Sequence, residues 1–414
     1  MPRIQLGQDS LQLWETAHLI SRQTAVEASA QHWVRNSGPN PGDRTYRFRV
    51  YPTRGQALSL EAQLGFACEL YNAALEQRRY GWRAGRRIGY VTQCRDLTEL
   101  RAAGDGPPAM SCSAMRSPLR RLERAYQAFF RRVKAGEKPG YPRFRSRRRY
   151  DSLTWDSGWS IRDRRLVLLG IGHLRVKWHR DLPPSGKVCT VTVRRVAGRW
   201  HACFALAIPA PAAQKRALMP AVGVDLGVQN FAALSTGDLI PGPRAYRTAT
   251  RQLRAAQRRV SRRAKGSRRR QKAGLLLARL HERIGNLRRD HAHKLSRRLV
   301  SDFGLVAVED LQLRGLTRGF LAKDIRDQGW AEFLRLLGYK AEDAGVQVVR
   351  VPPGGTSQGC STCGTWVSKP LSERTHRCPS CGLVVDRDVN AARNILRLGL
   401  SRQATTWPTG ACVA

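Results

Sequence analysis

The pattern of apolar and polar residues in the first part of the chain changes from period two to helical spacing. Residues 44–51 alternate basic residues with aromatic or aliphatic ones, which predicts a half-buried strand that Pro52 ends. Residues 56–83 then carry apolar residues at helical spacing, and residues 118–133 do so again with arginines on the opposite face. We therefore expect one strand followed by two amphipathic helices.

Between residues 152 and 208 the pattern is mostly that of β-strands. Short apolar runs predict strands at residues 166–169, 174–178, 188–196 and 200–208. Glycines and prolines divide these runs, which is typical of a small β-barrel. If the strand at 44–51 joins it, the helical segment at about 56–135 is an insertion into the barrel. We expect residues 44–215 to form one domain, which the proline-rich stretch 209–220 links to the next.

The second half of the chain alternates strands and helices, which predicts an α/β domain over residues 216–400. Apolar residues on both sides of Asp225 predict a β-hairpin whose first strand carries that acid. After it we expect two antiparallel helices, the first from the basic run at 251–272, which is broken near Gly266, and the second at 275–300. A buried strand at 302–311, a helix at 330–344, a strand at 345–353 and a last helix at 386–396 should follow.

The two ends of the chain are expected to be peripheral. Residues 11–34 have the spacing of one amphipathic helix, and a stretch rich in glycine and proline separates it from the predicted strand. We therefore treat residues 1–43 as an extension and residues 401–414 as a short tail.

Four cysteines form two Cys-x-x-Cys pairs, each followed by a glycine: Cys360, Cys363, Cys378 and Cys381. Two such turns direct four thiolates at one ion, as in a zinc ribbon, which we place at residues 356–384. The alternative is two disulfides or redox dithiols. We expect no secretory leader, and in a reducing cytoplasm this pattern favours a metal. Four sulfurs close the coordination shell, so the predicted Zn²⁺ is structural.

The chain carries 73 Lys and Arg against 31 Asp and Glu, a formal net charge of +42. Such an excess repels itself unless a polyanion neutralises it, so we expect a nucleic-acid partner and salt-sensitive affinity. A membrane is the competing polyanion, but no apolar run is long enough to span one. An ordinary solvated surface is the other alternative for the basic residues. The arginines expected to contact nucleic acid are Arg78, Arg79, Arg143, Arg145, Arg147, Arg148, Arg149, Arg258, Arg259, Arg262, Arg263, Arg268, Arg269 and Arg270.

Three acidic residues lie far apart in sequence but at comparable places in predicted elements. Asp225 lies in a strand, Glu309 ends another, and Asp388 lies in the first turn of a helix. This order fits a ribonuclease-H-like α/β fold, in which converging carboxylates hold two Mg²⁺ ions about 4 Å apart. Each acid also has an ordinary explanation as a turn residue, a helix cap or a first-turn acid. We expect Asp386 to cap the helix and Asp388 to bind metal.

Several motifs resemble, in order, those of one family. GVDLG around Asp225, VEDL around Glu309, TSQGCSTCG, CPSCG and DRDVNAARNI resemble the split RuvC-type nuclease and zinc ribbon of the TnpB (OrfB-type) transposon-associated proteins. YRFRVYP, LYNAAL and GYPRF are similar to the amino-terminal half of that family. The resemblance runs from about residue 44 to about residue 397.

The resemblance implies an RNA-guided DNA endonuclease in the bacterial cytoplasm, associated with the nucleoid. Its guide RNA would come from the transposon end, and its amino-terminal lobe would read a short motif beside the double-stranded DNA target. The carried-over catalytic, magnesium-binding triad is Asp225, Glu309 and Asp388. Base pairing would then supply the sequence specificity, while a basic channel holds the RNA–DNA duplex by its backbone.

Three alternatives remain open at this point. A compact type V CRISPR effector shares this nuclease and ribbon, and a neighbouring repeat array would identify it. A guide-binding repressor that does not cleave is expected to have lost at least one metal ligand, which argues against it here. A strand-transferring transposase would need a residue for covalent transfer, and no motif in the chain suggests one.

Overall fold

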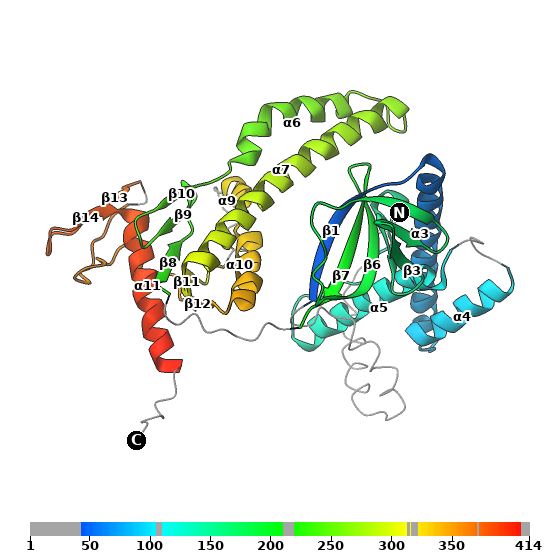
Figure 1. The fold of residues 1–414 in the computed structure, drawn as a ribbon, viewed down its shortest axis with the longest axis horizontal. Coiled ribbons are helices and arrows are strands. Elements are labelled where there is room, and N and C mark those ends of the chain that lie inside the picture. The colour runs from blue at the N-terminus through cyan, green and yellow to red at the C-terminus, as the bar shows by residue number, and fades with distance from the viewer. Residues whose placement is uncertain are drawn as a thin grey trace, which may run out of the picture. The chain divides into compact units, whose positions relative to one another are not determined.

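The computed structural model describes residues 43–104, 110–209, 219–312, 315, 322–370 and 372–406, with side chains up to residue 402. The chain divides into two compact units, residues 1–209 and 210–414, which are described separately (Figure 1). No helix in the described ranges is long and apolar enough to cross a membrane. The predicted helix at 11–34, most of the predicted linker at 209–220 and the end of the tail lie outside the described residues.

Unit 1 is built on a seven-stranded sheet with the strand order β2-β6-β7-β1-β5-β4-β3. Its strands are β1 (Asp43–Tyr51), β2 (Ser152–Trp155), β3 (Trp159–Arg162), β4 (Arg165–Leu168), β5 (Gly172–Lys177), β6 (Lys187–Val196) and β7 (Arg199–Ala207). The first strand lies in the middle, because it pairs antiparallel with β7 from Asp43↔Ala207 to Val50↔Trp200 and with β5 on its other side. The edge strands β2 and β3 do not pair with each other, so within the described chain the sheet is an open half-barrel and not the closed barrel that we expected.

The segment between β1 and β2 is helical, as expected, but it contains one more helix than the sequence suggested. Its elements are α3 (Arg54–Arg83), α4 (Tyr90–Ala102), α5 (Cys112–Lys134) and the short 3₁₀ turn η2 (Arg147–Arg149). Helix α4 was not predicted because it buries only Gln93 and Leu97, too few positions to produce a helical period.

Both long helices of this segment begin at a side-chain cap. Thr53 and Gln56 form a reciprocal capping box before α3. At α5 the Ser111 hydroxyl accepts a hydrogen bond from the Ala114 N–H, so this helix begins six residues before the predicted start. Pro118, which we expected at the helix start, lies inside the helix.

The core of unit 1 lies between the sheet and helices α3 and α5. Its largest fully buried side chains come from both layers and include Phe48, Tyr71, Leu119, Trp155 and Phe204. Strand β1 and the inserted helices therefore share one core, although the helices interrupt the sheet in sequence.

Unit 2 is built on a five-stranded mixed sheet with the order β10-β9-β8-β11-β12. The strands are β8 (Ala221–Asp225), β9 (Asn230–Leu234), β10 (Leu239–Pro241), β11 (Leu305–Glu309) and β12 (Gln347–Val351). The hairpin predicted around Asp225 is present as β8 and β9, which pair antiparallel. Strand β11 pairs parallel with both β8 and β12. The expected mixed α/β, multidomain architecture is thus confirmed.

The helices of unit 2 are α6 (Ala245–Ser261), α7 (Arg268–Asp302), α9 (Ala322–Gln328), α10 (Trp330–Ala344) and α11 (Arg387–Thr406). Helices α7 and α10 pack on one face of the sheet in a core that contains Phe231, Leu299 and Phe333. Helix α11 packs against the central strands in a separate core through Ile395. Figure 1 shows α6 and α7 as a long antiparallel pair that extends beyond the sheet of this unit.

Two boundaries in unit 2 differ from the predicted ones. The basic run is broken near Gly266, as expected, but the second helix, α7, begins at Arg268 and not at residue 275. The Ser267 hydroxyl caps its start by accepting from the Arg270 N–H. The turn between them contains Gly266 with φ +87°, a conformation that favours glycine. Helix α11 also continues to Thr406, beyond the predicted end at residue 396.

Residues 352–386, between β12 and α11, carry the four paired cysteines. The segment contains only two short strands among its described residues, β13 (Thr375–Arg377) and β14 (Val384–Asp386), which pair antiparallel. The segment therefore has little regular structure and few buried apolar residues of its own.

Candidate functional site

Strand β11 directs its last residue toward helix α11. Leu305 and Ala307 of β11 pack in the small core with Ile395 of α11, whereas Val306 between them packs in the opposite core under α7 and α10. Successive strand residues point to opposite faces of a sheet, so Glu309 lies on the α11 face.

Strand β8 directs its last residue to the same face. A Cβ atom on Gly223 would lie 2.0 Å from the main-chain oxygen of Ala392 in α11, so Gly223 faces that helix, and Asp225, two residues on, does too. Val224 is the parallel partner of Val308, and the next residue of each strand is an acid. The two carboxylates are therefore neighbours at the ends of adjacent strands.

The third acid lies at the start of α11. The Asp386 carboxylate accepts hydrogen bonds from the N–H groups of Asp388 at 2.8 Å and Val389 at 3.3 Å, which confirms the predicted cap. A Cβ atom on Gly227 would lie 3.6 Å from Oδ2 of Asp388, so the loop that follows Asp225 passes beside this carboxylate. The three acids expected from the sequence thus come together from two strands and one helix.

The electrostatics of this group fit a cation. Burial, together with the negative charges of Glu309 and Asp388, raises the pKa of Asp225 to about 8, although the side chain keeps a partly exposed surface. Burial also raises the pKa of Asp388, against the opposing charge of Arg374, whose guanidinium forms an ion pair with its carboxylate. Converging carboxylates that resist ionisation are the donor set that a divalent ion stabilises.

The carboxylate oxygens of the three acids do not lie as close to one another as the four cysteine sulfur atoms do. Among the residues that the structure describes, the four cysteines are the one close group of three or more potential metal-binding side chains. A pair of ions about 4 Å apart can be shared by carboxylates that are too far apart to bind one ion together. The arrangement of the acids is therefore compatible with two ions.

Two side chains of the cysteine-bearing segment contact the acids, and sequence reasoning missed both. The Thr356 hydroxyl donates to Oε1 of Glu309 at 2.6 Å, and Arg374 pairs with Asp388. Thr356 lies within the TSQGCSTCG motif, so the motif marked its position but not its partner. Nothing in the sequence around Arg374 indicated its contact.

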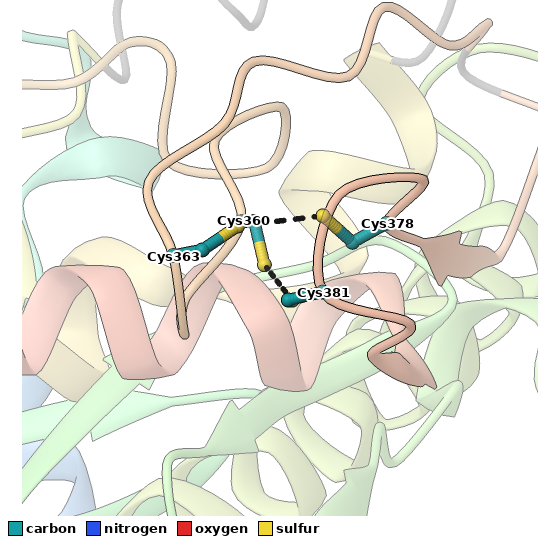
Figure 2. A group of neighbouring side chains, drawn as sticks. All are labelled: Cys360, Cys363, Cys378 and Cys381. Carbon is teal, nitrogen blue, oxygen red and sulfur yellow. Dashed lines mark hydrogen bonds between the residues drawn. The ribbon is translucent and has the colours of Figure 1, made fainter.

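The four cysteines form one cluster whose sulfur atoms all lie within 4.8 Å of one another: Cys360, Cys363, Cys378 and Cys381 (Figure 2). The sulfur atoms of Cys360 and Cys381 are 3.6 Å apart, and those of Cys363 and Cys378 are 3.5 Å apart. These distances exceed a disulfide bond, and all four thiols are free. The cluster can therefore hold a metal ion, as expected.

Both cysteine turns have the same backbone geometry. The N–H of Gly364 donates to the Cys360 oxygen and that of Gly382 to the Cys378 oxygen, each at 3.0 Å, and both glycines have positive φ. Hydrogen bonding with Thr365 lowers the pKa of the Cys363 thiol to about 6. A lowered thiol pKa favours the thiolate, which is the form that binds metal.

The predicted nucleic-acid arginines fall into three groups. At α6 and the two residues after it, the predicted residues Arg258, Arg259, Arg262 and Arg263 line a hollow together with Ala255 and with Arg251, which was not predicted. In unit 1 the exposed ones are Arg143, Arg145, Arg147, Arg148 and Arg149. Arg79 is half-buried and lies over the ring of Phe144.

Arg78 and Arg270 also have partners within the protein. Arg78 is 9% exposed, pairs with Glu123 at 2.8 Å and donates to Gln93, so it joins α3 to α4 and α5. Arg270 donates to the main-chain oxygens of Val260 and Arg263, which closes the turn between α6 and α7. Both side chains stabilise the fold, and the partly exposed guanidinium of Arg270 keeps its charge because carbonyl oxygens do not neutralise it.

Three segments of the chain match known protein families. The OrfB family described as "Probable transposase" matches residues 207–319, a Cas12f1-like TNB domain matches 330–395, and a family described as a helix-turn-helix domain matches 43–87. In this structure the last of these stretches forms β1 and α3.

Relatives that align over most of the chain show which family it belongs to. A "Putative RNA-guided DNA endonuclease" of Streptomyces pristinaespiralis is 39% identical over 374 residues, which cover 87% of this chain and 90% of that protein. The chain belongs to the TnpB (OrfB-type) family. A second relative of this TnpB-family chain, "Putative RNA-guided DNA endonuclease InsQ" of Escherichia coli K12, is 29% identical over 86% of this chain and 92% of its own.

The fold of this TnpB-family chain is also similar to a solved structure. A Cas12f1 chain from a complex with single guide RNA and target DNA aligns with a TM-score of 0.55 over 85% of this chain and 98% of its own, at 14% sequence identity. At this identity the likeness concerns the fold alone.

Proposed function

We propose that the chain is the RNA-guided DNA endonuclease of a transposon, with a ribonuclease-H-like, RuvC-type nuclease domain in unit 2. The observation that carries the proposal is the convergence of Asp225, Glu309 and Asp388 on the α11 face of the sheet. Relatives that span most of the chain are named as RNA-guided DNA endonucleases, which supports the same activity here.

In this proposal the three acids hold two Mg²⁺ ions and are the catalytic residues. When bound, such ions activate water for in-line attack on a phosphodiester and stabilise the leaving oxygen. The chain itself fixes the geometry, because two carboxylates end adjacent strands and the third begins a helix that Asp386 caps. Burial makes the charges of Asp225 and Asp388 costly until a cation neutralises them.

The cysteine cluster is proposed to bind one structural Zn²⁺. Its four thiolates would fill the coordination shell of the ion and leave no position for a substrate. The ion would hold together a segment that contains only β13 and β14 as strands in its described part. The ribbon would then support the acids through Thr356 and Arg374 and perform no chemistry of its own.

The arginine hollow of α6 is proposed to contact the phosphate backbone of the guide RNA or of its duplex with DNA. It presents five arginines, at positions 251, 258 and 259 in α6 and at positions 262 and 263 directly after it. Phosphate contacts of this kind supply affinity without sequence information, and they weaken as salt rises. The exposed arginines at 143–149 provide a second basic surface in unit 1.

A compact type V CRISPR effector is a second candidate, because the fold is similar to that of Cas12f1. The genomic neighbourhood separates the two functions. Transposon ends beside the gene support the first proposal, and a repeat array supports the second.

The experiment that tests the function uses the protein expressed from its native locus. The RNA that copurifies is sequenced, and the complex is given a plasmid library that carries the matching target beside random flanking bases. We expect Mg²⁺-dependent double-strand cleavage beside one short motif. Asp225→Ala is expected to abolish cleavage while leaving RNA binding nearly unchanged.

A matched pair of neighbouring acids tests the site itself. Glu309 lies on the α11 face, whereas Asp310 is exposed and pairs with Arg350. We expect Glu309→Ala to remove cleavage and Asp310→Ala to retain it, because an exposed ion pair contributes little. Cleavage by Glu309→Ala, or equal loss in both variants, would contradict the proposed site.

A further inference from the structure

The side chain of Thr356 contacts one of the three acids directly. Its hydroxyl donates to Oε1 of Glu309 at 2.6 Å, and the residue is 8% exposed. Thr356 follows β12 and lies four positions before Cys360, so it belongs to the start of the cysteine-bearing segment. Residues 309 and 356 therefore meet only because this segment folds back over the end of β11.

Two buried amides of α11 hold the main chain around Thr356. Asn394 donates to the main-chain oxygens of Thr356 at 2.8 Å and Gly359 at 2.7 Å. Asn390, one turn earlier, donates to the same Gly359 oxygen at 2.8 Å and accepts from the Ser361 N–H at 2.9 Å. Both amides are almost completely buried, which makes these bonds costly to break.

This attachment does not need the threonine hydroxyl. The amides bind main-chain atoms, which any residue at position 356 would offer, whereas the hydroxyl is directed at Glu309. The helix that supplies the amides also carries Asp388 in its first turn. A hydroxyl fixed to α11 thus determines the orientation of a carboxylate on β11.

We propose that Thr356 is a positioning residue that orients Glu309 for divalent-cation binding, an inference that rests on the proposed nuclease function. The hydroxyl occupies one lone pair of Oε1 and leaves the other carboxylate oxygen available to a cation. Because the hydroxyl is neutral, it orients the carboxylate without competing with the cation for its charge, unlike the guanidinium of Arg374 at Asp388. Hydrogen-bond partners of metal-binding carboxylates commonly fix ligand orientation in this way.

Two substitutions separate the hydroxyl from the shape of the side chain. Thr356→Val keeps the branched shape and removes the donor, whereas Thr356→Ser keeps the donor and removes the methyl group. Mn²⁺ is titrated into each full-length, zinc-loaded protein, and binding is followed by the electron paramagnetic resonance of the free ion, with no nucleic acid present. We expect Thr356→Val to weaken Mn²⁺ binding by about 10- to 100-fold and Thr356→Ser to stay within about threefold of the wild type.

Zinc content, measured by elemental analysis, is expected to be equal in all three proteins. Wild-type affinity in Thr356→Val would overturn the proposal, and so would a loss in Thr356→Ser as large as that in Thr356→Val. Zinc loss confined to Thr356→Val would overturn it too, because the residue would then act in folding of the ribbon.

Glu309→Ala separates this inference from the proposed function. Weak Mn²⁺ binding in Glu309→Ala together with normal binding in Thr356→Val removes only the positioning role. No Mn²⁺ binding in the wild type, or full binding in Glu309→Ala, removes the nuclease site and the positioning role together.

Discussion

Replacing Gly223 by alanine tests the contact that brings the acids together. A Cβ atom at this position would lie 2.0 Å from the Ala392 oxygen, 2.7 Å from the Leu396 nitrogen and 2.9 Å from the Leu396 Cβ. A carbon–oxygen contact needs about 3.3 Å, so α11 must move away from β8 by about 1 Å. The obstructing atoms belong largely to the main chain of a packed helix, which cannot rotate away as a flexible side chain can.

The expected cost lies at the upper end of the range for overpacked cores, about 3 kcal/mol. For a unit of this size, each kcal/mol lowers the transition temperature by about 2–4 °C, so we expect a decrease of about 6–12 °C. Differential scanning calorimetry measures the shift. Because α11 carries Asp388, Mn²⁺ binding should weaken in the same variant.

Gly274→Ala is the matched control. Gly274 lies inside α7, and a Cβ atom there would meet nothing within 4 Å. Alanine in a helix interior is more stable than glycine by about 0.5–1 kcal/mol, so this variant should melt slightly above the wild type. An unchanged transition temperature in Gly223→Ala would refute the close contact between β8 and α11, and with it the placement of Asp388 beside Asp225.

Three further predictions follow from the site and its surroundings. The pKa of Asp225 in the ion-free protein is about 8, above the ordinary 3.8, so the folded state holds this proton more tightly than the unfolded state does. The stability that this group contributes should therefore decline as the pH rises from about 4 to about 8, and chemical denaturation should show a weaker pH dependence in Asp225→Asn. Cys378→Ser should release the zinc, as elemental analysis would show, and should destabilise the segment between β12 and α11 because few buried apolar residues support it. The double variant Arg258→Ala/Arg262→Ala should fold normally, bind guide RNA more weakly and lower the salt dependence of binding by about one unit of slope for each lost contact.

A specific experimental result would contradict each of these three predictions. Equal pH dependence in wild type and Asp225→Asn would show that the carboxyl ionises normally. Unchanged zinc content in Cys378→Ser would remove this thiol from the cluster. An unchanged salt slope in the arginine variant would mean that the α6 hollow does not contact phosphates.

Features set by neighbouring residues could be predicted from the sequence. Helix α10 has the predicted bounds because glycines with positive φ, Gly329 and Gly345, flank it on both sides. The cap at Asp386 and the geometry of the two cysteine turns are likewise local. The shared face of Asp225 and Glu309 follows from strand alternation once the parallel pairing of β8 and β11 is known.

Features that depend on distant partners could not be predicted. Arg78 looked like one basic residue among many, but Glu123 from another helix pairs with it and buries it. The bond from Thr356 to Glu309 joins residues that only the folded segment brings together. The open edge of the sheet in unit 1 also depends on how strands far apart in sequence pair, which the spacing of apolar residues does not record.

The central place of β1 in its sheet has a consequence for synthesis on the ribosome. This strand is complete at Tyr51, but its partners β5 and β7 begin only at Gly172 and Arg199. At bacterial elongation rates of about 5–20 residues per second, the nascent chain must wait on the order of 10 s before β1 has a neighbour. During that interval the apolar faces of α3 and α5 have no sheet to cover them, so the early chain is vulnerable to aggregation. A translation product that stops before β7 would keep that vulnerability permanently.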